Sequence, residues 1–263
     1  MIGKVRPRDR SEEEVSGYRR ALDWIFVRKG IVKITPAVIR KLHSMAQGGT
    51  TGDAGDWKQR DNEIIEILPN GERLIRFVPT SAEDTPRAVE LLCGNYSVAC
   101  VEESTPPLIL IATFVFDFLC IHPFHDGNGR VSRLLTTLLL VSHGFEVSRY
   151  VSLERLVEQS MDDYYRVLGE CSKDLREGRN EITPWWNYLL GIIRAGYKEF
   201  GERIENLAAH PAKSDLVEQT ILEQVLAEIG AASPQLVKKV FSELKAAVRG
   251  GFLPNCGEYP ANV

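Results

Sequence analysis

The sequence predicts a mainly helical, all-α protein with one short β-hairpin and a small helical appendage at its C-terminal end. Apolar residues recur at helical spacing along most of the 263 residues. One segment differs, because an Asn-Gly pair stands there between two short apolar runs, and this pair is a strong signal for a tight turn between antiparallel strands. Near the C-terminal end, a segment with small residues and a proline separates two further helical patterns from the rest.

Two helices are predicted before the hairpin. Ser11 is followed by three glutamates, a composition that suits a helix N-terminus, and apolar side chains continue at helical spacing over 12–28. Thr35 and Pro36 suit the N-cap and the first position of a second helix, over 36–46. A glycine-rich loop follows this second helix.

The hairpin is predicted over residues of about 63–77, with Asn70 and Gly71 in its turn. After the hairpin, Ser81 and Asp84 suit the capped start of a helix. The helices predicted for the rest of the main domain lie at 81–98, 106–120, 128–143, 152–171 and 183–206.

We divide the chain into a main domain over 1–206, a linker over 207–214 and a C-terminal helical module over 215–263. Two amphipathic helices are predicted in the module, the second with Ser233 as its N-cap. The pair resembles part of a winged-helix or helix-turn-helix module, although only a stub of the hairpin of the winged form follows. DNA binding, a partner surface and a dimer surface are the open alternatives for this module.

The composition argues against several functional classes. A net charge of −4 provides no overall basic field for nonspecific nucleic-acid binding. The five cysteines include no CxxC pair, which indicates reduced thiols. The N-terminal residues are too polar for a secretory signal, and the longest apolar run, at 106–121, is short and contains two prolines and an aspartate. We therefore expect a cytoplasmic protein without a membrane partner.

Residues 122–133 read HPFHDGNGRVSR and carry the clearest functional pattern. His122 can accept a proton near neutral pH, and Asp126 can bind a divalent cation. Gly127 and Gly129 permit positive φ angles and allow backbone N–H groups to approach an anion closely. The pattern therefore combines a base, a cation ligand and an anion-binding turn.

Two arginines complete this pattern. Arg130 and Arg133 follow at i and i+3 on the predicted helix, so their guanidinium groups are expected to point the same way. Guanidinium groups bind phosphates bidentately, and the N-terminus of the helix adds its positive dipole to the same place. The segment therefore predicts a site for the transfer of a charged phosphoryl group.

The segment resembles the signature of the Fic family, H-x-F-x-D/E-G-N-G-R-x-x-R. The resemblance extends over residues of about 12–205, and it is specific at the signature, where every fixed position is filled. These positions are His122, Phe124, Asp126, Gly127, Asn128, Gly129, Arg130 and Arg133.

The resemblance implies a helical Fic fold and a protein AMP transferase, which moves AMP from MgATP to a Ser, Thr or Tyr hydroxyl of a target protein and releases pyrophosphate. It implies that His122 is the general base and that Asp126 is the Mg²⁺ ligand, while Phe124 packs in the core and fixes the loop. The nucleotide-binding residues that it implies in the signature are Gly127, Asn128, Gly129, Arg130 and Arg133.

Two further features follow from the resemblance. Tyr165 belongs to a Tyr-Tyr pair on a later helix and would contact the base or ribose, although Ser172 stands where some family members have an asparagine. The hairpin at about 63–77 corresponds in position to the flap, which holds the target protein by pairing with its backbone.

One familiar part of the family pattern is absent. Many members carry an inhibitory helix with the pattern S/T-x-x-x-E-G/N, and this chain contains no full match. We therefore expect either an inhibitory helix lost by truncation or a separate inhibitory partner. A homodimer is a further open possibility.

Three alternatives remain open at this point. Transfer of another nucleoside monophosphate, or removal of AMP from a modified target, would use the same residues. A metal phosphohydrolase of the HD type would use His125 and Asp126 with His43 as an upstream ligand, but it leaves the glycines and arginines unexplained. A regulator that binds DNA or a protein partner through its C-terminal helices would belong to a different class.

Overall fold

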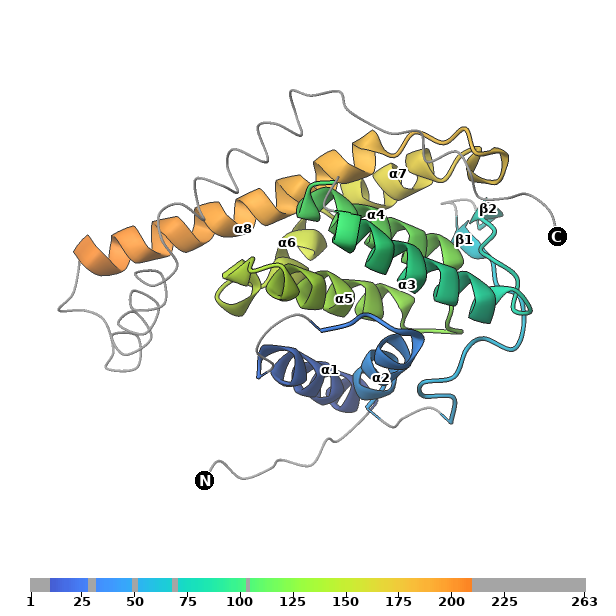
Figure 1. The fold of residues 1–263 in the computed structure, drawn as a ribbon, viewed down its shortest axis with the longest axis horizontal. Coiled ribbons are helices and arrows are strands. Elements are labelled where there is room, and N and C mark those ends of the chain that lie inside the picture. Colours follow the sequence, from blue (N-terminus) through green and yellow to red (C-terminus); the bar gives the residue numbers. More distant parts are fainter. Residues whose placement is uncertain (1–9, 28–31, 49–51, 68–70, 103–104, 210–263) are drawn as a thin grey trace.

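The computed structural model describes residues 10–27, 32–48, 52–67, 71–102 and 105–209, which are mostly helical with one two-stranded hairpin (Figure 1). This architecture confirms the predicted fold class of a mainly helical domain with a short hairpin. The elements are α1 (Arg10–Phe26), α2 (Pro36–Ala46), β1 (Ile64–Ile67), β2 (Arg73–Phe77), α3 (Thr85–Glu102), α4 (Pro107–Ile121), α5 (Asn128–Ser142), η1 (Glu146–Arg149), α6 (Leu153–Gln159), α7 (Met161–Cys171), η2 (Leu175–Glu177) and α8 (Thr183–Ala209).

Two apolar helices, α4 and α5, form the centre of the bundle, and most of their side chains are buried. α4 packs against α3, α5 and α8, whereas α5 packs against α1, α2 and α4. Only a short loop joins α4 to α5, so the segment 122–133 lies where the two central helices meet (Figure 1). The candidate site is therefore built on the most deeply buried helices of the domain.

The predicted starts of two helices are confirmed, one of them with a shifted boundary. The Thr35 hydroxyl accepts a hydrogen bond from the Val38 N–H at 3.3 Å, and Pro36 takes the first helical position of α2. The Ser81 hydroxyl accepts from the Asp84 N–H at 3.0 Å, but the α-helix itself begins later than predicted, at the start of α3.

The prediction of one helix over 152–171 is wrong, because α6 and α7 are separate helices that meet at Ser160. The Ser160 hydroxyl donates to the Leu156 carbonyl at 3.0 Å and lies 2.8 Å from the Tyr188 hydroxyl of α8. A serine that bonds to preceding carbonyls competes with the regular helical pattern and often bends or ends a helix. This local competition decides the break that apolar periodicity does not reveal.

The hairpin is confirmed as an antiparallel pair, in which Ile65 lies opposite Ile75. A register irregularity separates Ile64 from Ile65. The turn residue Gly71 has φ +83°, whereas the predicted turn residue Asn70 lies outside the described residues. Apolar side chains of both strands are exposed, so the hairpin offers an apolar surface as well as its strand edges.

The last described helix, α8, continues to Ala209, so the first three residues of the predicted linker at 207–214 are helical. The rest of that linker and the predicted module at 215–263, with Ser233, lie outside the described residues. Within the described ranges, no helix combines the length and the apolar character that a bilayer span requires.

Candidate active site

The loop of the candidate site begins at the last turn of α4 and ends at the first residue of α5. His122 caps α4 in the left-handed region, with φ 51° and ψ 60°, and its N–H donates to the Phe118 carbonyl at 3.0 Å. A non-glycine residue in this region is uncommon and typically marks a position that the surrounding structure constrains. His122 therefore ends α4 at a constrained position.

The His122 ring is oriented by one backbone contact. Its Nδ1 lies 3.3 Å from the Leu119 carbonyl, and because a carbonyl only accepts, Nδ1 carries the hydrogen and Nε2 keeps its lone pair. The pKa of His122 is lowered to about 4, mainly by burial; the nearby charge of Lys58 also lowers it, while the Leu119 bond and Asp126 oppose the shift. At neutral pH the ring is therefore uncharged and can accept a proton at Nε2.

The side chain of Asn128 bonds within its own loop. Its side-chain oxygen accepts from the Phe124 N–H at 2.9 Å, and its Nδ2 donates to the Phe124 carbonyl at 2.7 Å. The Asn128 side chain is almost fully buried, and this amide closes the loop on itself. The predicted packing role of Phe124 is confirmed, since its ring is fully buried.

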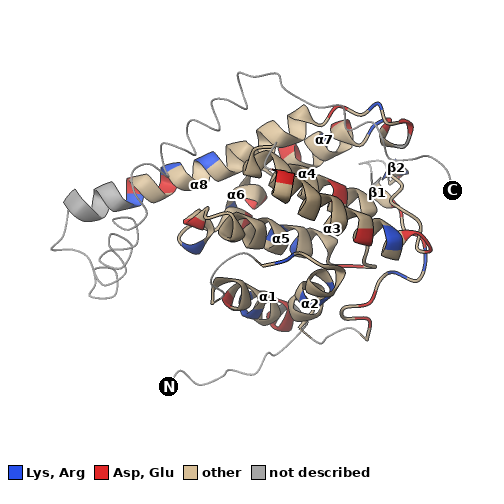
Figure 2. Ribbon diagram, in the orientation of Figure 1, with Lys and Arg blue, Asp and Glu red and all other residues tan. Residues whose placement is uncertain are grey.

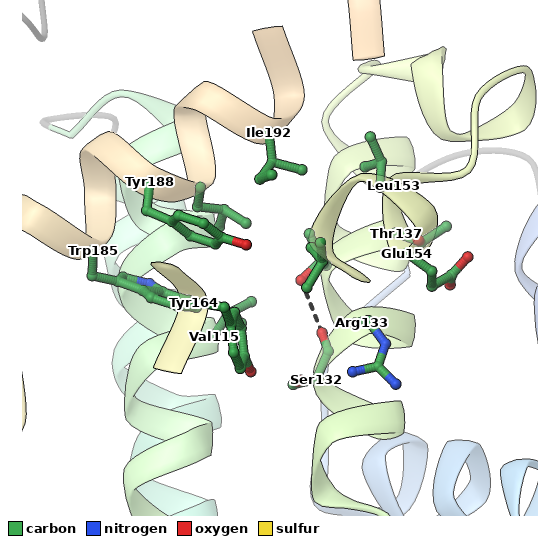
Figure 3. A pocket seen from close by; sticks show the side chains of 13 residues that line it. Val115, Ser132, Arg133, Thr137, Leu153, Glu154, Tyr164, Trp185, Tyr188 and Ile192 are labelled. Atoms are coloured by element: carbon green, nitrogen blue, oxygen red, sulfur yellow. Dashed lines mark hydrogen bonds between the residues drawn. The ribbon is translucent and has the colours of Figure 1, made fainter. Parts of the chain in front are cut away.

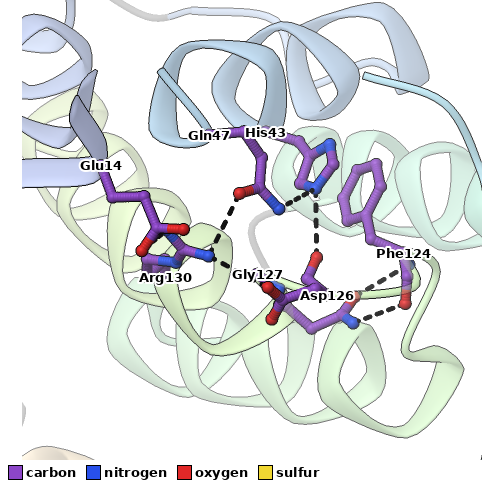
Figure 4. A network of polar contacts seen from close by, with 8 residues as sticks. Glu14, His43, Gln47, Phe124, Asp126, Gly127 and Arg130 are labelled. Atoms are coloured by element: carbon purple, nitrogen blue, oxygen red, sulfur yellow. Dashed lines mark hydrogen bonds and ion pairs between the residues drawn. The ribbon is translucent and has the colours of Figure 1, made fainter. Parts of the chain in front are cut away.

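His43 of α2 supports the loop from the other side of the Phe124 ring. The two rings stack with their centroids 3.8 Å apart. His43 Nδ1 accepts from the Gly55 N–H at 2.9 Å, so Nε2 carries the hydrogen and donates to the Asp126 carbonyl at 3.1 Å (Figure 4). Both ring nitrogens are thus engaged with backbone groups, which leaves the HD-type hydrolase alternative without its upstream metal ligand.

Lys58 and Asn62 also support this loop, and the sequence analysis missed both. The Lys58 N–H donates to the Pro123 carbonyl at 2.9 Å, and its Nζ donates to the Ile121 carbonyl at 3.2 Å and to Asn62 at 2.9 Å. Lys58 is only 3% exposed, and burial lowers its pKa to about 8. A single lysine in a loop has no sequence pattern that distinguishes it from a solvated one, so only the tertiary contacts identify it.

The glycine turn behaves partly as predicted. Gly127 has φ +81°, and a Cβ at this position would lie 3.0 Å from the Gln47 amide of α2, so both backbone conformation and space favour glycine. Gly129 instead has helical backbone inside α5. The Asp126 Oδ1 accepts from the Gly127 N–H at 2.6 Å, and the Asp126 side chain is 55% exposed.

Asp126 can serve as a single carboxylate ligand for a cation. Among the described residues, no three side chains of His, Cys, Asp or Glu gather into a metal-binding group. Mg²⁺ suits such a place, because it commonly takes one or two carboxylates and fills its other positions with phosphate oxygens and waters. The donor set around Asp126 therefore fits the predicted Mg²⁺.

Both arginines lie against α1, since Arg130 contacts Glu14 and Arg133 interacts with the Tyr18 hydroxyl. Arg130 Nη1 lies 3.0 Å from the Glu14 carboxylate of α1, without a directed hydrogen bond, and Nη2 donates to Gln47 Oε1 at 3.2 Å (Figure 4). Arg130 Nη2 is also 3.5 Å from the Asp126 carboxylate. In this arrangement Arg130 joins the turn to α1 and α2.

Arg133 remains close to the glycine turn, since a Cβ on Gly129 would lie 3.5 Å from its Nη1. Arg133 and Glu154 line one side of a cavity, and the rings of Tyr164, Trp185 and Tyr188 line the other side (Figure 3). The cavity holds about 30 Å³, which is enough for a water or two but far too small for a nucleotide.

Tyr165 differs from its neighbour in exposure. Tyr164 is buried, whereas Tyr165 is 63% exposed, and the two rings meet edge to face with centroids 5.3 Å apart. Tyr164 therefore belongs to the core, whereas the ring of Tyr165 is exposed, and its contact with a base or ribose stays a prediction.

The Fic/DOC family model matches residues 33–140 of this chain. A Fido domain-containing protein of Dictyostelium discoideum is 34% identical over 127 residues, which cover 47% of this chain and 82% of that protein. Because the similarity covers most of the relative at this identity, it concerns the whole domain of that relative and not a short motif.

Two solved structures have a similar fold. A Fic family protein from Desulfovibrio desulfuricans matches with a TM-score of 0.60 at 22% identity, over 76% of this chain and 56% of that one. A Fic domain-containing signalling protein from Bacteroides thetaiotaomicron matches with a TM-score of 0.55 at 23% identity, over 75% of each chain. At these identities the similarity shows the fold alone, and this chain spans little more than half of the Desulfovibrio protein.

Proposed function

We propose that this chain, which belongs to the Fic/DOC family, transfers AMP from MgATP to a Ser, Thr or Tyr hydroxyl of a target protein. The family includes AMP transferases and enzymes that transfer other nucleoside monophosphates or related groups to proteins. One observation carries the proposal: His122 is a neutral imidazole whose Nε2 lone pair is available, on the loop that also holds Asp126 and the glycine turn.

In the proposed reaction, His122 Nε2 accepts the proton of the target hydroxyl. The hydroxyl oxygen forms a bond to the α-phosphorus of ATP, the bond from that phosphorus to the bridging oxygen breaks, and pyrophosphate leaves with the electron pair. The low pKa of His122 keeps Nε2 unprotonated before the reaction and favours release of the accepted proton to solvent afterwards.

Asp126 would hold the Mg²⁺ that accompanies ATP, through the carboxylate that is exposed beside the turn. When bound, Mg²⁺ neutralises charge on the phosphate oxygens. The chain's own contribution is to fix this carboxylate: the Gly127 N–H bonds to one of its oxygens, and the His43 ring bonds to the Asp126 carbonyl.

Arg133 is the arginine that we assign to the phosphates, because its guanidinium lies next to Gly129. The positive end of α5 begins at the same turn and favours an anion there. Arg130 would act indirectly, by holding the turn against Glu14 and Gln47. Tyr165 would stack on the adenine with its exposed ring.

The hairpin of β1 and β2 would position the target protein. Its strands form a separate two-stranded sheet, so each has an outer edge that an extended peptide can pair with. Exposed apolar side chains such as Ile75 could contact the target's side chains as well. Backbone pairing would place a hydroxyl without requiring a particular sequence around it.

The test uses purified protein with Mg²⁺ and ATP labelled at the α or the γ position, alone and with cell lysate as a source of target. We expect protein-bound label from the α position only, and its loss in His122→Ala. The matched control is His125→Ala, which removes an exposed histidine of the same loop and should retain labelling.

Other outcomes would change the proposal in defined ways. Label from the γ position would mean phosphorylation and would overturn AMP transfer. Label only from another nucleotide would replace AMP by that nucleoside monophosphate, and release of AMP from a modified target would indicate the reverse reaction. Equal labelling in wild type and His122→Ala would overturn the assignment of His122 as the base.

A further inference from the structure

One face of α3 carries an apolar stripe that no part of the described structure covers. Leu91 is 45% exposed, Val98 is 58% exposed and Val101 is 83% exposed, and exposed Gly94 lies between the first two. These residues recur every third or fourth position, so they share one face of the helix. A Cβ on Gly94 would meet nothing within 4 Å, which leaves the middle of the stripe open.

The opposite face of α3 is fully used. Val89, Leu92 and Cys93 are buried, and α3 packs against α4 with a smaller contact to α2. α3 lies on the outside of the bundle (Figure 1), and its charged residues lie toward its two ends (Figure 2). The helix thus has a second apolar face that its own domain does not need, and such a surface is typical of an interface.

The central part of this stripe is self-complementary, whereas Val101 would lie opposite Ala88. A half-turn about an axis between Gly94 and Asn95 places residues at equal distances from that axis opposite each other. Leu91 of one copy would then lie opposite Val98 of the other. The same rotation places Arg87 near the start of α3 opposite Glu102 at its end. All four residues lie close to one line along the exposed face of α3. Within each pair, one residue precedes the middle of the stripe and the other follows it at the same distance.

We propose that two copies of this chain associate through α3, packed antiparallel about a two-fold axis near Gly94. Symmetry makes each contact occur twice, so two Leu91–Val98 contacts lie at the centre and two Arg87–Glu102 ion pairs lie at the ends. Gly94 allows the two helices to approach closely at the axis. The proposal does not depend on the proposed enzymatic function.

The charge arrangement favours a second copy over an unrelated partner. An unrelated partner would impose no relation between the residues at the two ends of the stripe, whereas a two-fold axis between Gly94 and Asn95 is favoured by opposite charges at equal distances from it, although exposed Glu90 then lies opposite uncharged Ala99. Arg87 and Glu102 carry such opposite charges, and both are exposed. A contact made by one helix from each copy is small, so we expect a dimer that dissociates on dilution.

The full-length chain should be measured by sedimentation velocity over a concentration series. We expect the mass to rise from monomer to dimer with concentration. Leu91→Asp should weaken association by about a hundredfold, because two copies each bring a carboxylate into the apolar centre. Arg87→Glu should weaken it by about tenfold, because both end pairs become repulsive.

The charge-reversal variants make the test specific for this geometry. Arg87→Glu combined with Glu102→Arg in one chain should restore association, and the two single variants should associate with each other better than either does with itself. Arg19→Glu reverses an exposed charge on α1 and should leave association unchanged. Circular dichroism should show that each variant keeps its helical content.

Two results would overturn the proposal. A chain that remains monomeric over the whole series would mean that the α3 stripe binds something other than a second copy. A dimer that is insensitive to Leu91→Asp and to both charge reversals would form through a different surface.

Discussion

His43 and His122 both lie at the loop between α4 and α5, but they differ in whether a ring nitrogen remains to accept a proton. Burial lowers the pKa of both rings, so both are neutral at pH 7. His43, which belongs to α2, forms hydrogen bonds to backbone groups through both ring nitrogens, one with Gly55 and one with Asp126. His122 bonds through Nδ1 only.

The difference shows that burial alone does not make a histidine a base. A ring with two backbone partners fixes the position of its neighbours and has no lone pair to offer, whereas a ring with one partner is oriented and still accepts a proton. Under the proposed function, the region around His43 contributes stability and the end of α4 contributes chemistry. The following predictions, in order of decreasing effect, test that division.

The largest effect is expected for His122→Ala. Loss of a general base typically costs about 10²–10⁴-fold in rate, and the proposed transfer should fall by this factor. Because the ring makes only one weak backbone contact, the unfolding midpoint should stay near that of the wild type. Parallel assays of labelling and thermal unfolding check both parts, and a large drop in stability would contradict the division.

His43→Ala should show the reverse pattern. The change removes a fully buried ring, its stacking on Phe124 and two backbone hydrogen bonds, and we expect a loss of about 2–4 kcal/mol in the free energy of unfolding. Urea unfolding measures this loss. His43→Phe is the matched control, because it keeps the stacked ring and removes only the hydrogen bonds, and it should lose less.

The pH dependence should separate the two histidines next. With a pKa of about 4, His122 is protonated only in acid, so its contribution to the rate should be constant from neutral pH down to about pH 5 and should fall as the pH drops through 4. NMR titration of the ring protons measures this pKa without any activity assay. Titration of His122 near its ordinary value of 6.5 would contradict its burial.

The free energy of unfolding should also depend on the protonation of His43 and His122. The pKa of each ring is lower in the folded state than in the unfolded state, so between these pKa values the folded state binds fewer protons. The contribution of the two rings to the free energy of unfolding is therefore complete above about pH 6.5 and decreases as the pH falls toward 4. Between about pH 6.5 and 4, His122→Ala should lose less free energy of unfolding than the wild type, because only one of the two histidine rings remains.

The smallest effect on His122 is expected from Lys58→Met. Removal of a nearby positive charge should raise the His122 pKa, but only modestly, because burial is the larger cause of its low value. The same change leaves the Ile121 carbonyl without its lysine, which should cost about 1–2 kcal/mol in stability. A fall in the His122 pKa on this substitution would contradict the role of the lysine charge.

The order of the helices and the hairpin could be predicted because their signals are local. The Thr35 cap, the Asn-Gly turn and the periodic apolar residues each act within a few positions of the chain. The division of 152–171 at Ser160 could not, since it depends on whether a hydroxyl bonds to its own helix and to Tyr188 of a distant one.

In the candidate site, too, some features could be predicted from the sequence and others could not. The spacing of residues 122–133 placed a histidine at the end of one helix and a glycine turn at the start of the next. The spacing could not reveal the hydrogen-bond and ion-pair partners of the Asn128 and Arg130 side chains. Asn128 is occupied by its own loop, and Arg130 is turned toward Glu14, which lies far away in the chain.

The amino-acid sequence by itself determined the helical class of this protein, its Fic-type segment and the kinds of side chain available to its chemistry. Only the tertiary structure decided which of those side chains are free to act. Whether a ring nitrogen or a guanidinium is available depends on partners brought from other elements, such as the Gly55 N–H for His43 and Gln47 for Arg130. Burial then set the His122 pKa, because desolvation depends on everything packed around the ring.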